Sequence, residues 1–196
     1  KWHYYKNKIV LGFLLFSGYG IIRSVFSEFP IESLTNEGSV FYFRYIFFAM
    51  GVWYLVDENP YLTRCLLVIS LFCLIIVCVD GTYQYLLDVN IFGNEKHSIF
   101  RLTGLFGKEP ILGRYIALLS IFTFALMYKY VGNSKKRIIL SVAFLVMCEV
   151  VVFLTGERAP LFYVSLFSLL IIIYIPNFRL IRIAGFFISV AIIVAI

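Results

Sequence analysis

The sequence predicts an all-α protein, a polytopic bundle of about seven transmembrane helices with one long external loop. Of its 196 residues, 62% are apolar and 14% are charged, whereas about 25% of residues are charged in an ordinary soluble domain. The apolar residues also fall in blocks that approach the roughly 20 residues needed to cross a bilayer. These observations exclude a water-soluble globule and indicate a single membrane domain over residues 1–196.

Charged and turn-forming residues divide the chain into seven candidate spans, at residues 9–22, 38–56, 65–79, 111–128, 138–154, 159–175 and 183–196. The second, fourth, fifth and sixth have 17 residues or more, which is adequate for a span. The third has 15; the first and last have 14 each, which leaves an interfacial or re-entrant segment open. Because the chain begins at Lys1 and stops at Ile196 inside an apolar run, we also expect it to be truncated at one or both ends.

Lysine and arginine are unevenly divided between the two sides of these spans. If the N-terminus is cytoplasmic, one side holds ten of them and the other holds six, and the basic turns GNSKKR and NFRLIR lie on the first side. Cytoplasmic loops are enriched in Lys and Arg, so we expect a cytoplasmic N-terminus. The net charge of +6 then reflects membrane topology, not a nucleic-acid partner. Residues 80–110 become the long external loop, and its first part, Asp80–Asp88, is expected to form a short interfacial helix.

The end of this loop, RLTGLFGKEP, leads directly into the fourth span and is a candidate anion site. Gly104 and Gly107 permit a tight backbone whose N–H groups point at a phosphate beside a helix N-terminus. The flanking cations are Arg101, Lys108 and Arg114. The alternative is a turn that caps a membrane helix and places its cations among lipid headgroups.

A second external feature is the tight turn LTGERAP between the fifth and sixth spans. Gly156 permits the reversal, and Arg158 is held on a short connector. A guanidinium fixed in this way suits bidentate binding of phosphate or carboxylate. The alternative is a simple connector in which Glu157 and Arg158 pair with each other.

Two charged residues, Arg44 and Glu149, lie inside predicted spans. A charge at the centre of a membrane helix costs about 2.5–3.5 kcal/mol, so it normally faces a partner or a wet cavity. Arg44 lies six residues inside Gly38 and Glu149 six residues inside Thr155, so both lie at a depth of about 9 Å from the external surface. We therefore predict that they pair or line the floor of one externally open cavity.

The two histidines, His3 and His97, are too few and too far apart for a metal site or a catalytic triad. No metal and no cofactor is expected. His97, on the external loop, is a minor candidate for a general base.

Three segments in order, DGTYQYLLDVNIFG, RLTGLFGKEPILGRYIA and LTGERAPL, resemble the O-antigen ligase and O-antigen polymerase family. These are membrane enzymes that move glycans carried on a polyprenyl diphosphate. The resemblance covers residues 80–161 and rests on an external Arg-x-x-Gly-x-Phe motif and a Thr-Gly-x-Arg turn two helices later.

The resemblance implies a glycosyltransferase of surface polysaccharide synthesis in the bacterial inner membrane, acting on its external side without a metal. Its partners would be an undecaprenyl-diphosphate-type glycan donor, a glycan or lipid-core acceptor and the bilayer. Arg101 and Arg158 would hold the diphosphate, in a cavity with Arg44, Arg114 and Glu149. Glu157 and Asp88 are the local candidates for the base, although the family's histidine base would lie beyond Ile196.

Several alternatives remain open at this point. The sequence does not distinguish a ligase from a polymerase. A polytopic transporter or channel would use Arg44 and Glu149 as an intramembrane site. A membrane scaffold would leave these charges and the external arginines without a role.

Overall fold

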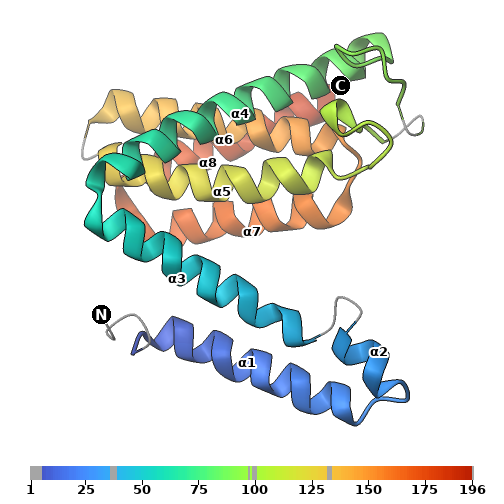
Figure 1. Ribbon diagram of the computed structural model, residues 1–196. Helices are drawn as coiled ribbons and strands as arrows, with labels where there is room; N and C mark the ends of the chain where they lie inside the picture. The colour runs from blue at the N-terminus through green and yellow to red at the C-terminus, as the bar shows by residue number, and fades with distance from the viewer. Residues whose placement is uncertain (1–5, 36–38, 97, 99–100, 132–133, 196) are drawn as a thin grey trace. The chain divides into compact units, whose positions relative to one another are not determined.

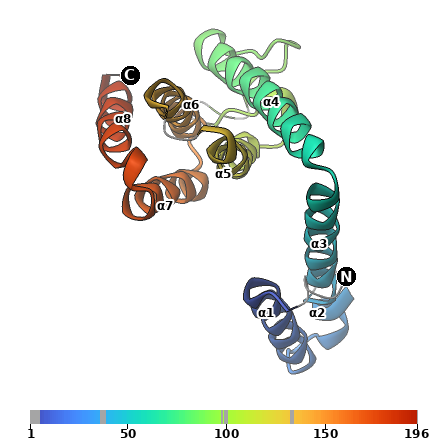
Figure 2. The same cartoon turned by 90° about the vertical axis from the view of Figure 1, so that its left-hand side faces the viewer.

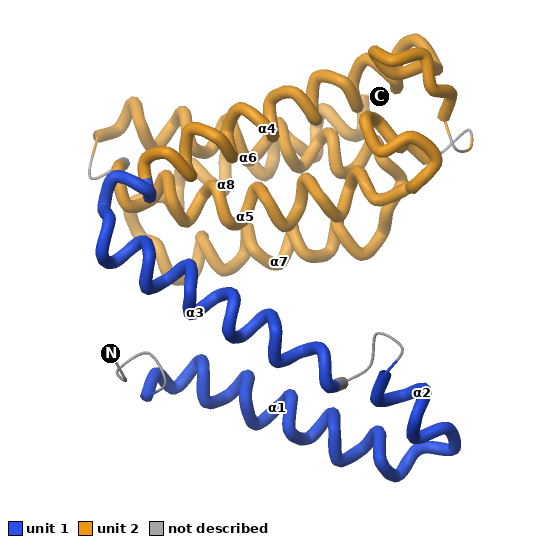
Figure 3. Tube along the Cα trace, in the orientation of Figure 1, with its two compact units in different colours: residues 1–63 blue, residues 64–196 orange. Residues whose placement is uncertain are grey.

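The computed structural model of the protein describes residues 6–35, 39–96, 98, 101–131 and 134–195. Within these ranges the secondary structure is helical, apart from two isolated β-bridges, Val89 with Glu95 and Ser98 with Arg101. The chain forms two compact units, residues 1–63 and 64–196, which we describe separately (Figure 3).

Unit 1 contains α1 (Lys8–Val25), α2 (Pro30–Thr35), the 3₁₀ turn η2 (Ser39–Phe41) and α3 (Tyr42–Glu58). The side chain of Asn7 caps α1 by accepting the N–H of Ile9 at 2.8 Å. The core of this unit joins α1 to α3 through Val10, Ile46 and Met50. Beside this core, the two helices line an apolar groove of about 670 Å³.

Unit 2 is a helical bundle formed by α4 (Pro60–Leu87) from residue 64 onward, the 3₁₀ turn η3 (Gly104–Phe106), α5 (Leu112–Val131), α6 (Lys135–Leu154), α7 (Arg158–Tyr174) and α8 (Pro176–Ala195) (Figures 1 and 2). Helix α6 makes the most extensive contacts in it, above all with α8 and α5, and it also packs against α7.

Two apolar clusters hold this bundle together. One joins α4, α5, α6 and α7, and Leu102 of the α4–α5 connection is part of it. The other joins α5, α6, α7 and α8 around Phe124 and Phe178, whose rings meet edge to face with centroids 5.4 Å apart. Both clusters are built from side chains that face inward.

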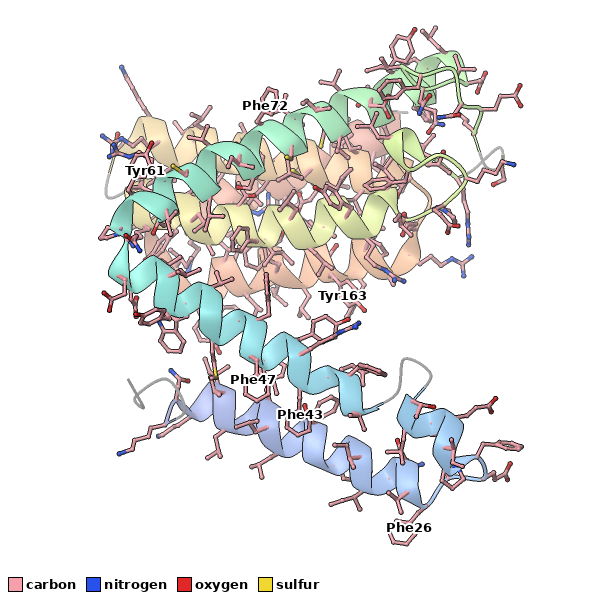
Figure 4. The ribbon with its side chains drawn as sticks, viewed as in Figure 1. Phe26, Phe43, Phe47, Tyr61, Phe72 and Tyr163 are labelled. Carbon is pink, nitrogen blue, oxygen red and sulfur yellow. The ribbon has the colours of Figure 1, made fainter. Side chains whose placement is uncertain are left out.

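The outward faces of the helices are also apolar, as a membrane protein requires. On unit 2, Phe72 of α4 is 64% exposed and Tyr163 of α7 is 45% exposed, and both are labelled in Figure 4. Soluble proteins rarely expose large continuous apolar patches. Five helices, α1, α4, α5, α6 and α8, are long and apolar enough to cross a membrane.

The predicted count of seven spans is not confirmed by helix length. Helix α7 is apolar but has 17 residues, and α3, also with 17, is not among the five. The first and last spans are longer than predicted, with 18 residues in α1 and 20 in α8.

The expected interfacial helix Asp80–Asp88 is wrong, because residues 80–87 continue α4 to a length of 28 residues. No proline interrupts this stretch, and Gly81 packs closely on Leu112 and Val151. The helix stops where Asp88 adopts a left-handed conformation, φ 63°. The predicted loop 80–110 therefore shortens to the residues after Leu87.

The basic turn NFRLIR is also wrong as a loop, because α8 begins at Pro176 and includes all of it. Proline suits the first turn of a helix, where its missing N–H costs nothing. Arg182 is thereby carried into the bundle and is fully buried.

Candidate functional site

Both sequence motifs lie at one end of unit 2, which we call the loop end. It comprises the last two turns of α4, the described residues between α4 and α5, the start of α5 and the turn 155–157 between α6 and α7. In Figure 1 this end is at the right, where α4 finishes and α5 begins.

Gln84 anchors the α4–α5 connection to α4. Its Oε1 accepts the backbone N–H groups of Thr103 at 2.9 Å and Gly104 at 2.8 Å. Its Nε2 donates to the hydroxyl of Thr103 and to the carbonyl of Asn94, both at 3.3 Å. Gln84 and Thr103 are fully buried, so these bonds replace the water that the groups lose on folding.

Asn90 and Asp80 complete this buried polar network. The Asn90 amide donates to the carbonyl of Gly104 at 2.6 Å, and Oδ1 of Asp80 accepts the N–H of Ile91 at 3.0 Å. Both side chains are almost completely buried. The connection between α4 and α5 is therefore fixed by side chains that the sequence analysis did not select.

Gly104 does not present its N–H to an anion, as the sequence predicted, because Gln84 accepts it. Its backbone is left-handed, φ 54°, and a Cβ there would lie 3.0 Å from Oδ2 of Asp80 and 3.1 Å from Leu112. Gly107 also has a positive φ, 66°, but with ψ −110°, and an added Cβ there would meet nothing within 4 Å. Gly104 is thus a packing position.

We predict that Gly104→Ala lowers the free energy of unfolding by about 2–4 kcal/mol, because left-handed strain adds to overpacking. Gly93→Ala is the matched control, since φ is 82° there and an added Cβ would meet nothing within 4 Å. Thermal unfolding in detergent measures both. Equal losses in the two variants would show that the space around Gly104 is not limiting.

The turn between α6 and α7 is bonded to the start of α5. Gly156 is left-handed, φ 70°, and Glu157 follows it. Oε1 of Glu157 accepts the backbone N–H of Gly113 at 2.7 Å. This bond joins residues 44 positions apart and brings the second motif against the first.

This contact corrects two predictions. The anion position at the N-terminus of α5 is filled by the carboxylate of Glu157, so it is not free for a phosphate there. The Glu157–Arg158 pairing that was left open is also not found, since Glu157 bonds to Gly113 instead.

The three arginines predicted at the external motifs all lie at the loop end, and all are exposed. The backbone N–H of Arg101 donates to the carbonyl of Ser98 at 3.1 Å. Arg114 directly follows Gly113, and Arg158 directly follows Glu157. Their guanidinium groups form no hydrogen bond or ion pair with any residue that the structure describes. These charges are therefore available to a ligand.

The candidate bases have different surroundings. The exposed carboxylate of Asp88 forms an ion pair with Lys96 at 2.6 Å, and Lys96 also donates to the carbonyl of Tyr85. The half-buried carboxylate of Glu157 is engaged with α5. His97 lies outside the described residues, and so does His3.

Glu149 has a partner, but it is Arg182 and not the predicted Arg44. Nη2 of Arg182 donates to Oε1 of Glu149 and to the hydroxyl of Ser168, and that hydroxyl donates to the same Oε1. Arg182 is 0% and Glu149 4% exposed. The cluster joins α6, α7 and α8 inside the bundle. The predicted depth of Glu149 below the external surface did not identify Arg182 as its partner.

Arg44, in unit 1, has local partners. Its Nη2 donates to the hydroxyl of Tyr45 at 2.8 Å, and its guanidinium lies 4.8 Å from the centroid of the Tyr45 ring and 5.6 Å from that of Phe41. These contacts are typical of a cation held by aromatic side chains.

Gly185 leaves room for the buried pair, because a Cβ there would lie 2.6 Å from Val142 and 3.5 Å from Nη1 of Arg182. Nη1 and Nε of Arg182 and Oε2 of Glu149 have no hydrogen-bond partner among the described residues. The sequence contained one signal for this cluster. Arg182 is a charged residue with helical residues on both sides, but the sequence analysis assigned it to the basic turn NFRLIR.

No group of three His, Cys, Asp or Glu side chains in the described ranges is arranged to hold a metal ion. Comparison of the chain with models of protein families, with curated proteins and with solved structures finds no match.

Proposed function

We propose that the protein is a membrane glycosyltransferase that transfers or polymerises glycan from an undecaprenyl-diphosphate-type donor. The acceptor is a glycan or a lipid core, and the product belongs to the bacterial cell surface. The support is the resemblance of residues 80–161 to O-antigen ligases and polymerases, together with the chemistry of the loop end.

One observation carries the proposal. The two motifs are 44 residues apart at Gly113 and Glu157, yet one hydrogen bond joins them, and exposed arginines without partners among the described residues flank both sides of that bond. A structural cap would be expected to pair its arginines with nearby carboxylates. Here a hydrogen bond joins the two motifs, and their guanidinium groups have no partner among the described residues. This arrangement favours a diphosphate ligand.

Glycosyl transfer from a diphosphate leaves negative charge on the departing phosphate oxygen. In our proposal Arg101, Arg114 and Arg158 stabilise this charge as it forms, as preorganised donors do in other acyl and phosphoryl transfers. The acceptor hydroxyl also needs a base. Asp88 and Glu157 are the two local candidates, and each already has a partner: Asp88 pairs with Lys96, and Glu157 accepts from Gly113.

The proposed membrane topology places the loop end outside the cytoplasm. In it α3 and α7 also cross the bilayer, which completes seven spans, and the N-terminal segment is cytoplasmic. The bilayer is that of the bacterial inner membrane. Helix α4, about 42 Å long at 1.5 Å per residue, exceeds the roughly 30 Å hydrocarbon core, so its last turns would project toward the donor's head group.

The test is transfer by the purified protein, produced from its native reading frame and reconstituted in liposomes with a polyprenyl-diphosphate-linked oligosaccharide. We expect longer glycans or glycan attached to a lipid-core acceptor, with activity retained in EDTA. A product from either acceptor supports the proposal and decides between polymerase and ligase. Absence of product with both acceptors would contradict it.

A further inference from the structure

Glu157 is an unusual helix-capping residue. It occupies the N-cap position of α7, but its side chain makes no hydrogen bond to α7. An N-cap side chain normally accepts an N–H from the first turn of its own helix. Here the carboxylate instead accepts the Gly113 N–H, in the first turn of α5. The interaction therefore caps α5 from the start of α7 and links the two helices.

Gly113 fits this contact closely. A Cβ at position 113 would clash most closely with Oγ1 of Thr155, and it would lie 2.9 Å from Oε1 of Glu157 and 3.1 Å from its Cδ. Contacts shorter than about 3 Å would force the carboxylate away. Any residue other than glycine at 113 would thus displace both Thr155 and Glu157, and with them the turn between α6 and α7. Thr155, fully buried beside it, limits how far the turn can shift.

The bond fixes the starting points of two arginines. Arg114 directly follows the backbone N–H that donates this bond, and Arg158 directly follows the residue whose side chain accepts it. Among the described contacts, neither the Arg114 nor the Arg158 guanidinium forms an ion pair or hydrogen bond with the carboxylate of Glu157. The negative charge of Glu157 is instead directed at the N-terminus of α5, where it is favourable.

We propose, on the basis of the proposed function, that Glu157 is a positioning residue. Its bond to Gly113 holds Arg114 and Arg158 so that both contact the diphosphate of one lipid-linked donor. Glu157 does not itself touch the reacting atoms or remove a proton. This assigns donor binding, and not base catalysis, to a residue that the sequence offered as a candidate base.

Glu157→Gln separates the two roles, because the amide oxygen still accepts the Gly113 N–H but the carboxylate base is lost. We expect Glu157→Gln to keep kcat and the KM for the donor within about threefold of the wild type. Glu157→Ala and Gly113→Ala, which break the contact from opposite sides, should lower kcat/KM for the donor about tenfold or more, because displaced arginines lose both donor binding and charge stabilisation.

The measurements are steady-state transfer in liposomes and the melting temperature of each variant in detergent. If Glu157→Gln loses kcat by about a hundredfold or more while it stays folded, Glu157 is a base and the inference is wrong. If Glu157→Ala and Gly113→Ala, folded, keep the wild-type kcat/KM for the donor, the inference is also wrong. Both results require an active wild type, whereas an inactive wild type would contradict the proposed function itself.

Discussion

Arg101→Ala and Arg158→Ala should each abolish measurable glycan transfer, with kcat lowered about 10²–10³-fold, as when a charge-stabilising donor is removed from a transition state. Both side chains are exposed and unpaired among the described contacts, so neither variant should unfold the protein. Arg→Lys at the same positions should recover little, because an ammonium cannot replace a bidentate fork.

The matched control for these variants is Arg137→Ala. Arg137 is exposed, at the other end of unit 2, and donates to the carbonyl of Tyr130 at 2.9 Å. Surface polysaccharide from cells that carry each variant, with protein levels measured in membranes, provides the comparison. Normal polysaccharide from both Arg101→Ala and Arg158→Ala would refute the roles proposed for these arginines.

Arg182→Met should destabilise the bundle by about 3–5 kcal/mol, because it leaves the buried carboxylate of Glu149 without its counter-ion. Glu149→Met should cost about as much, because it leaves the buried guanidinium of Arg182 without its counter-ion. The double variant with Met at both positions should recover most of the loss, because an apolar pair removes both buried charges together.

Unfolding in detergent with increasing denaturant measures this cycle. The expected sign is specific: the double variant is more stable than Arg182→Met alone. Ser168→Ala serves as the reference for losing one hydrogen-bond partner of the cluster, worth about 1 kcal/mol. Additive losses in the double variant would show that Glu149 and Arg182 do not form a pair.

The sequence predicted the helical, membrane-type fold because long apolar blocks are read from neighbouring residues. This signal does not depend on how the helices are arranged. It failed at Arg182 because a positive charge near a helix start resembles a topology signal. Its true role depends on Glu149, 33 residues away on another helix. The depth of a residue within its span could not show whether Arg44 or Arg182 is the partner of Glu149. Several side chains share one depth, and the packing of the helices decides which of them meet.

At the loop end, the sequence identified the exposed arginines but not what holds them. Gln84, Asn90 and Asp80 are ordinary polar residues in the sequence, and their role depends on bonds to residues between 11 and 20 positions away. Glu157 was found only as a neighbour of Arg158, since nothing local reveals that its carboxylate binds α5. Non-local hydrogen bonds of this kind follow from the fold and not from a motif.

The central claim, that the loop end binds a polyprenyl diphosphate through its arginines, is tested most directly by native mass spectrometry of the protein in detergent. Undecaprenyl diphosphate competes there with an equimolar neutral prenyl lipid of the same length. We predict that the wild type retains the diphosphate preferentially and that the triple variant Arg101→Ala, Arg114→Ala and Arg158→Ala loses this preference while it stays folded. Equal retention of the diphosphate by the wild type and the folded triple variant would contradict the claim.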